Sequence, residues 1–135
     1  MMIKGNAMKR HCLILAVAVL VPAGFALADG DAKLGSGVFK KCAACHTATE
    51  AINKVGPSLM GVVGRPVATA PGYSYSAAMT GFGEGGKVWD EATLSEYLLS
   101  PKAMVPGTKM SFAGLRKAED IANLIAYLKN PASGK

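Results

Sequence analysis

Apolar and polar positions follow their most regular pattern near the end of the chain. Ile121, Leu124, Ile125 and Leu128 have the i, i+3, i+4, i+7 spacing that places side chains on one face of a helix. Proline lacks the backbone N–H that a helix interior needs, so we expect this helix to end at Asn130-Pro131. The pattern therefore predicts an amphipathic helix close to the C-terminus.

A second helix is predicted just before Pro101. Asp90 is a suitable N-cap, because its carboxylate can accept a hydrogen bond from the first turn of the helix. Leu94, Tyr97 and Leu98 then share one face, and Pro101 is expected to stop the helix.

A third helix is predicted near the start of the region that follows residue 28. Leu34 lies four residues before Val38, which places both side chains on one helix face. We expect this helix to begin at about Asp31 and to run into Cys42.

The rest of the chain has no alternating pattern of the kind that predicts half-buried strands, so the expected fold class is all-α. Residues 56–88 form a long stretch that is rich in glycine and proline. Such a stretch would be a poor independent structure, and long loops in compact domains are usually functional or wrapped around something.

The first 28 residues are typical of an export signal. Their start is basic, with Lys4, Lys9 and Arg10. An apolar run follows over residues 12–21, and Ala26-Leu27-Ala28 supplies the small residues that a signal peptidase recognises. The run is shorter than the roughly 20 apolar residues of a membrane-spanning helix. We therefore expect cleavage before Asp29, a single domain over residues 29–135, and a periplasmic location without stable insertion into the membrane.

Removal of the signal would change both the charge and the cysteine content. The formal charge would fall from +6 to +3, because three basic residues leave with it. A charge this mild does not suggest nucleic-acid binding. Of three cysteines only Cys42 and Cys45 would remain, and they are too close in sequence to link distant segments.

Cys42-Ala43-Ala44-Cys45-His46 has the C-x-x-C-H pattern of a covalent haem attachment site. Positions i, i+3 and i+4 share one face of a helical turn, so one turn can present two sulfurs and an imidazole to the same planar ligand. The two sulfurs can add to the haem vinyl groups while His46 reaches the iron.

Two other readings of this motif are weaker. A thiol–disulfide pair of the thioredoxin kind is expected in a βαβ setting, which this chain lacks. A structural zinc site needs four ligands. Residues 29–135 contain only one histidine and two cysteines, so zinc would need a carboxylate from elsewhere.

A haem iron bound by His46 would have a second axial position. Residues 29–135 contain no second histidine, and their methionines are Met60, Met79, Met104 and Met110. Methionine is more often core filler than a ligand. Met110 stands out because it follows the stiffened turn Pro106-Gly107-Thr108-Lys109, whereas Met60 is close enough to His46 to be expected on the histidine side.

From Gly30 to Lys129 the chain resembles class I cytochrome c, the group of mitochondrial cytochrome c and bacterial cytochrome c2. The matching segments are Cys42 to His46, Val55-Gly56-Pro57, Gly64-Arg65, Ala70 to Tyr75, Trp89, Glu96-Tyr97-Leu98, Pro106 to Gly114 and Leu124 to Lys129. The resemblance implies crossed N- and C-terminal helices with loops wrapped around one haem. It also implies that Gly35 and Phe39 pack against Leu124 and Tyr127 at the crossing.

The resemblance implies roles for individual residues. Cys42 and Cys45 would be the thioether donors, and His46 and Met110 the axial ligands of the iron. The Pro57 carbonyl would accept a hydrogen bond from the other ring nitrogen of His46, which orients the ligand.

Five further residues would support the haem. The resemblance implies that Tyr75 and Trp89 hydrogen-bond a haem propionate and that Arg65 lies close enough to offset its charge. Tyr97 and Thr108 would lie near Met110.

One position departs from the family pattern. Many mitochondrial relatives have an asparagine where this chain has Met79, so a hydrogen-bond network near the haem is in doubt. Met79 could fill that space with an apolar group or offer a competing sulfur.

The function implied is that of a monomeric single-electron carrier between larger redox partners. Docking would use the lysines around the exposed haem edge, namely Lys40, Lys41, Lys54, Lys102 and Lys109. The alternatives are a peroxidase or gas-binding haem enzyme with a labile methionine ligand, and a dedicated electron-accepting subunit of a dehydrogenase.

Overall fold

The structure is a computed structural model that describes residues 29–135, so the expected export signal lies outside the described residues. The helices are α1 (Ala32–Phe39), α2 (Ala77–Phe82), α3 (Glu91–Leu99), α4 (Pro101–Met104), α5 (Ala118–Lys129) and the 3-10 turn η1 (Pro131–Gly134). Among these residues the only β pairing is an isolated antiparallel bridge between Pro66 and Val88. The predicted all-α class is confirmed.

The three predicted helices are all present, with one boundary that differs. α1 begins after Asp31, whose side chain accepts a hydrogen bond from the backbone N–H of Leu34. It ends at Phe39 and does not continue into Cys42 as predicted. The backbone bonds there shift to a tighter pattern, in which the N–H of Cys42 bonds to the carbonyl of Phe39.

α3 and α5 have the expected ends. Asp90 caps α3 by accepting a hydrogen bond from the N–H of Thr93, and the helix stops before Pro101. Pro101 then takes the first position of α4, where its missing N–H costs nothing. α5 ends at Lys129, just before Asn130-Pro131.

α2 was not predicted, and its composition explains why. None of its residues is buried, so no apolar period marks it in the sequence. Its start is fixed by Ser76, whose hydroxyl accepts a hydrogen bond from the N–H of Met79. A short capped helix of this kind depends on local hydrogen bonds and on its neighbours more than on a buried face.

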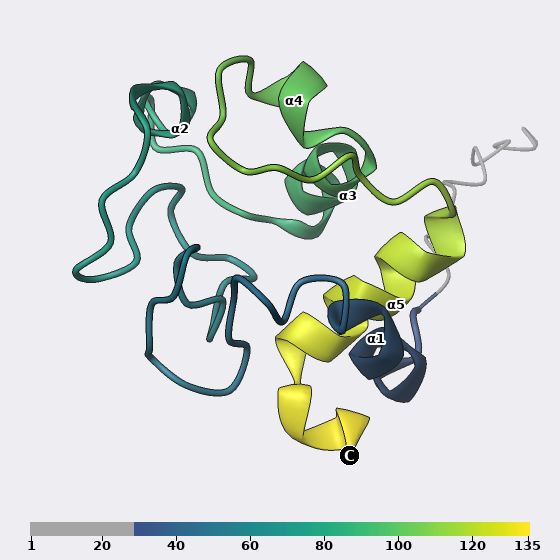
Figure 1. Cartoon of the computed structure of the whole chain (residues 1–135). Coiled ribbons are helices and arrows are strands. Elements are labelled where there is room, and N and C mark those ends of the chain that lie inside the picture. Colours follow the sequence, from purple (N-terminus) through teal and green to yellow (C-terminus); the bar gives the residue numbers. More distant parts are fainter. Residues whose placement is uncertain (1–28) are drawn as a thin grey trace, which may run out of the picture.

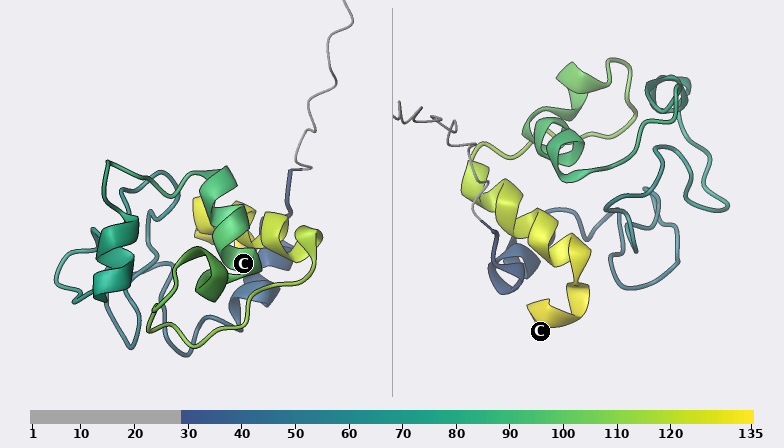
Figure 2. Two further views of the ribbon diagram at one scale, coloured as in Figure 1. Left: turned by 90° about the horizontal axis from the view of Figure 1, so that it is seen from above. Right: turned by 180° about the vertical axis from the view of Figure 1, so that it is seen from behind.

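α1 and α5 cross one another, as Figure 1 shows and the opposite view in Figure 2 repeats. At the crossing the helices approach so closely that a Cβ atom on Gly35 would lie 1.9 Å from the carbonyl oxygen of Asn123. Phe39 packs against Tyr127 with ring centroids 5.3 Å apart, and Leu124 is almost fully buried. The predicted crossing of the terminal helices and its need for glycine are confirmed.

The core is shared between helices and loops. Val62, Val67 and Trp89 are buried although they lie outside the helices, and they join the apolar faces of α3 and α5 in one cluster. No helix among residues 29–135 is long and apolar enough to cross a membrane.

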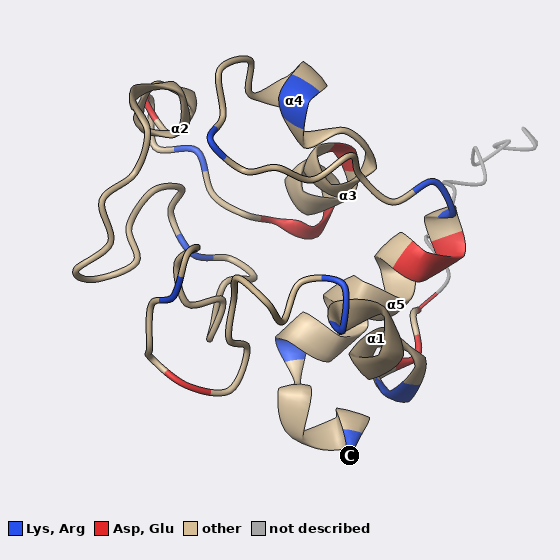
Figure 3. Ribbon diagram, viewed as in Figure 1, with Lys and Arg blue, Asp and Glu red and all other residues tan. Residues whose placement is uncertain are grey.

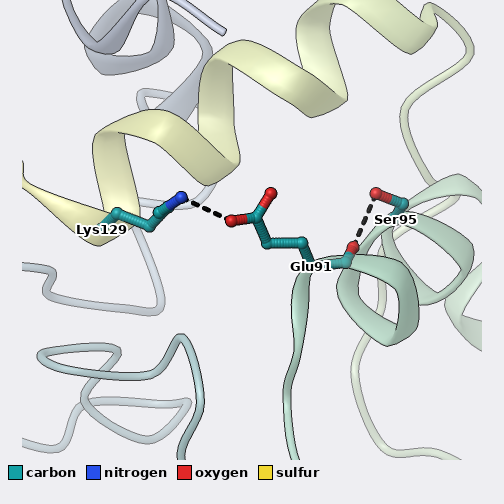
Figure 4. A network of polar contacts seen from close by, with 3 residues as sticks. All are labelled: Glu91, Ser95 and Lys129. Atoms are coloured by element: carbon teal, nitrogen blue, oxygen red, sulfur yellow. Dashed lines mark hydrogen bonds and ion pairs between the residues drawn. The ribbon is translucent and has the colours of Figure 1, made fainter. Parts of the chain in front are cut away.

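Lysine, arginine, aspartate and glutamate residues are spread over several helices and loops (Figure 3). Lys129 at the end of α5 forms an ion pair with Glu91 at the start of α3, and the backbone carbonyl of Glu91 also accepts a hydrogen bond from Ser95 (Figure 4). Both charged side chains are about half exposed, at 50% and 48%. Solvent-exposed pairs contribute little to stability, so packing holds α3 against α5.

The helix crossing gives a stability prediction. Gly35→Ala is expected to lower the free energy of unfolding by about 1–3 kcal/mol or more, because the new methyl group would meet the backbone of α5. Gly37→Ala is the matched control on the same helix, since a Cβ there would meet nothing within 4 Å.

Denaturant unfolding of both variants measures the difference. Gly37→Ala should be neutral or stabilising by up to about 1 kcal/mol, because alanine favours helix. Equal effects of the two substitutions would contradict a close helix crossing at Gly35.

Candidate functional site

A cavity of about 400 Å³ lies between the helices and the loops. Every site residue expected from the sequence lines it, namely Cys42, Cys45, His46, Pro57, Arg65, Tyr75, Trp89, Tyr97, Thr108 and Met110. Much of the remaining wall is apolar, with Phe39, Leu59, Val62, Leu94, Leu98, Phe112, Leu124 and Leu128. The volume and the apolar wall are those of a site for a sizeable apolar ligand.

The cysteines and the histidine are held on one hydrogen-bonded turn that follows α1. The backbone N–H groups of Cys45 and His46 both donate to the carbonyl of Cys42, each at 3.0 Å. Although α1 itself ends earlier, these bonds give the motif the geometry of a helical turn, which places the three side chains along the same cavity.

The two thiols are not joined in a disulfide. Burial raises the pKa of the Cys42 thiol, and the nearby Lys41 lowers it only in part. Catalytic C-x-x-C pairs have a lowered pKa at one cysteine, so the environment of Cys42 is the opposite of a thioredoxin-like site. Residues 29–135 also contain no cluster of three or more His, Cys, Asp or Glu side chains that could hold a metal ion by themselves.

The orientation of His46 is fixed by a hydrogen bond. Its Nδ1 lies 2.7 Å from the carbonyl oxygen of Pro57, and because a carbonyl can only accept, Nδ1 is the protonated nitrogen. Burial lowers the pKa of His46, an effect that its bond to Pro57 opposes and Lys54 reinforces. The neutral ring therefore keeps a free lone pair on Nε2, which is what a metal-binding imidazole needs.

Gly56 is a site residue to which the sequence analysis gave no role. A Cβ atom at this position would lie 2.3 Å from Cε1 of His46, so only glycine lets the backbone run beside the ring. The N–H of Gly56 also donates to the carbonyl of Cys45 at 2.8 Å, which ties this loop to the turn that carries the histidine.

Met110 is held by two neighbours. The hydroxyl of Tyr97 donates to its sulfur at 3.4 Å, and its backbone N–H donates to the hydroxyl of Thr108 at 3.3 Å. Burial raises the pKa of Tyr97, and a hydrogen bond with Thr108 lowers it in part. Tyr97 therefore remains a hydrogen-bond donor at neutral pH, and the second lone pair of the Met110 sulfur is left for a ligand bond.

Arg65 has a polar group that the described residues leave without a partner. Its two terminal nitrogens donate to the carbonyls of Met60 and Ser58, at 3.3 and 3.1 Å. Its Nε is fully buried and has no hydrogen-bond partner among residues 29–135. A buried unpaired donor is costly, and an anionic group in the cavity would satisfy it.

Tyr75 and Trp89 also line the cavity. The Tyr75 hydroxyl oxygen accepts a hydrogen bond from the N–H of Ala70 at 2.9 Å, so its own proton is free to donate elsewhere. Trp89 packs against Tyr97, with ring centroids 4.8 Å apart.

The four methionines of residues 29–135 divide into two groups. Met79 and Met110 line the cavity, whereas Met60 and Met104 do not. Met60 is 46% exposed. Met79 and Met110 are therefore the two methionines that could bind a ligand in the cavity. Met110 differs from Met79 in its contacts with Tyr97 and Thr108.

The lysines expected to dock a partner are all exposed, but they are not all placed alike. Lys41 and Lys109 line the cavity. Lys54 donates a hydrogen bond to the carbonyl of Ala43, which follows the cavity residue Cys42 in the chain. Lys40 is the C-cap of α1 and Lys102 lies on α4, and neither lines the cavity.

Asn53 is a second residue that the sequence analysis missed. Its side chain donates to the carbonyl of Pro71 and accepts from the N–H of Ser58, both at 2.9 Å. It thus joins two loops that are distant in sequence. An isolated polar residue in a loop gives no signal of such a role, because its partners are backbone groups.

The contact between Gly56 and His46 gives a prediction about the site. Gly56→Ala is expected to displace the imidazole and to reduce the fraction of purified protein that carries haem by severalfold, because the new methyl group would overlap the ring. Haem content per chain after expression in a host that matures c-type haem measures the effect.

Gly81→Ala in α2 is the matched control, since a Cβ there would meet nothing within 4 Å. It should leave haem content unchanged. A Gly56→Ala protein that loads haem as well as this control would contradict the packing of the loop against His46.

Comparison with known proteins points to one family. The sequence model of the Cytochrome c family matches residues 32–131. Cytochrome c2 of Agrobacterium tumefaciens is 47% identical over 108 residues, which cover 79% of this chain and 97% of that protein. Cytochrome c-554 of Methylosinus trichosporium is 48% identical over 125 residues, which cover 91% of this chain and 92% of that protein. The structure of cytochrome cH from Methylobacterium extorquens superposes with a TM-score of 0.67 at 44% identity, covering 74% of this chain and 98% of that one.

Proposed function

Because the chain belongs to the cytochrome c family, we propose that His46 and Met110 are the axial ligands of its haem iron and that Cys42 and Cys45 form the two thioether bonds. The chain carries one covalently attached haem c and is an electron-transfer protein, as its relatives are. The observation that carries the ligand assignment is that one cavity gathers these four side chains.

The residues around the cavity suit a haem. The wall is mostly apolar, as the porphyrin ring requires, and a neutral imidazole and a thioether sulfur supply the two ligand types. The buried Nε of Arg65 and the free hydroxyl proton of Tyr75 would serve the negatively charged propionates. We therefore assign Arg65 and Tyr75, with Trp89, to the propionate side.

When bound, the haem supplies an iron that changes between the ferric and ferrous states. His46 and Met110 would together leave the iron no open position for a substrate, which favours electron transfer over catalysis. Methionine–histidine ligation is the general cytochrome c arrangement and raises the reduction potential. Pro57 orients one ligand, and Tyr97 with Thr108 orients the other, so the protein holds both in fixed positions during the change of charge.

The proposed docking face is the edge of the cavity that carries Lys41, Lys54 and Lys109. Cytochromes of this family act with redox partners, and positive charge near the cavity would attract an acidic partner and speed encounter. We include Lys40 and Lys102 in the wider positive field, because both are exposed, Lys40 at the C-cap of α1 and Lys102 on α4.

We also propose that residues 1–28 are removed on export and that the mature protein works in the periplasm. The support for this proposal is the sequence of the segment, which has the charge and apolar pattern of a signal.

The ligand assignment is tested by the visible spectrum of the haem-loaded protein. The ferric form should show the weak far-red band of methionine-ligated haem. Met110→Leu is expected to abolish this band and to let carbon monoxide bind rapidly to the reduced protein, because the axial position becomes free.

Met79→Leu is the matched control, since Met79 also lines the cavity. It should keep the far-red band. Loss of the band in Met79→Leu together with its retention in Met110→Leu would assign the ligand to Met79. Colourless protein from a host that matures c-type haem would overturn the whole assignment.

The docking proposal predicts a charge-dependent reaction rate. The rate of oxidation by hexacyanoferrate(III), an anion, is expected to fall about twofold to tenfold as ionic strength rises from about 0.01 M to about 0.5 M. Lys41→Ala and Lys54→Ala should each lower the rate at low ionic strength, as measured by stopped-flow absorbance.

Two controls accompany this measurement. Lys33→Ala changes an exposed lysine of α1 that does not line the cavity and should have a smaller effect. A cationic oxidant of high reduction potential, tris(1,10-phenanthroline)cobalt(III), should show the opposite dependence on ionic strength. A rate that is insensitive to salt with both reagents would rule out electrostatic steering at this face.

A further inference from the structure

Side-chain contacts connect three loops along the edge of the cavity, outside the four residues assigned to the haem. The loops are those around Val55, Tyr73 and Lys109, and all three of these residues line the cavity. None of them was given a structural role by the sequence.

The first contact joins the loop of Met110 to the loop of Tyr73. Lys109 precedes Met110, and its ammonium group donates a hydrogen bond to the carbonyl of Ser74. The same ammonium lies 4.7 Å from the centroid of the Tyr73 ring, within the range of a cation–π interaction. A lysine expected to dock a partner is therefore already engaged by its own chain.

The second contact joins the loop of Tyr73 to the loop of His46. The Tyr73 hydroxyl donates to the carbonyl of Val55 at 2.9 Å. Val55 precedes Gly56, which packs on the imidazole of His46, and Pro57, whose carbonyl orients that imidazole. The ring of Tyr73 is itself fixed by an edge-to-face contact with Tyr75, with centroids 4.8 Å apart.

We propose that Tyr73 is a positioning residue that couples the His46 loop to the Met110 loop through Val55 and Lys109, and thereby keeps the Met110 sulfur on the iron against competing ligands. This proposal rests on the ligand assignment made above. Tyr73 uses its hydroxyl for one loop and the face of its ring for the other, so a single side chain connects both.

The exposure of the partners sets the expected size of the effect. Val55 and Lys109 are exposed and Tyr73 is half-buried, so water competes for each contact and each one alone is weak. Their combined loss is expected to weaken retention of Met110 by about threefold to tenfold. Loss of Tyr73 should also remove the part of the Lys109 effect that acts through the ring, because the two residues share that contact.

The test is displacement of Met110 by free imidazole in the ferric haem-loaded protein, followed by loss of the far-red band. Tyr73→Leu, which loses both contacts of Tyr73, is expected to raise the apparent affinity for imidazole by about threefold to tenfold, and Lys109→Gln, which keeps the contact of Tyr73 with Val55, by less. Tyr73→Phe keeps the ring and loses the hydroxyl, so it should have a smaller effect. Lys109→Arg keeps a cation over the ring and should restore the wild-type affinity.

The double variant and the controls decide the interpretation. Tyr73→Leu with Lys109→Gln should raise imidazole affinity by less than the product of the two single effects, whereas independent residues would give multiplied effects. Lys33→Gln on α1, outside the cavity and outside the proposed docking lysines, should match the wild type. Imidazole affinities equal to that of the wild type in all Tyr73 and Lys109 variants would overturn the proposal.

The experiment also separates this proposal from the ligand assignment. A wild-type protein without the far-red band would refute Met110 as ligand, and Tyr73 would then have no such role. A wild-type protein with the band, and variants that do not alter imidazole binding, would refute the role of Tyr73 alone.

Discussion

The close crossing of α1 and α5 at Gly35 is the constraint on which the rest of the structure depends. The turn with Cys42, Cys45 and His46 follows α1 directly, so the position of α1 on α5 decides where these side chains point. α5 also contributes Leu124 and Leu128 to the wall of the cavity. A shift of one helix on the other would therefore move one end of the site relative to its apolar wall.

The second half of the site is built differently. Met110 lies in a loop, and its position comes from Tyr97 on α3 and from Thr108 two residues earlier in the loop. His46 likewise depends on a backbone carbonyl of a neighbouring loop. The two side chains proposed as iron ligands thus depend on loops for their positions, and hydrogen bonds and buried residues in turn hold these loops in place.

The sequence predicted much of this arrangement, for reasons that differ between residues. The helices with a buried face were predictable because Ile121 and Leu94 belong to regular apolar patterns, and the haem motif was predictable because its spacing has one dominant chemical use. α2 was not predicted because none of its residues is buried. The end of α1 was predicted too late because its backbone hydrogen bonds change to the i to i+3 pattern at a point where the sequence has no glycine or proline. The roles of Gly56 and Asn53 depend on what lies across the fold, which no local pattern encodes.

The partial burial of Cys42 has a consequence for the order of haem attachment and folding. In the folded chain this thiol is half-buried and its pKa is raised, which makes it a poor nucleophile. The thioether bond proposed for Cys42 would therefore form more readily while the chain is still open than after it has closed around the cavity.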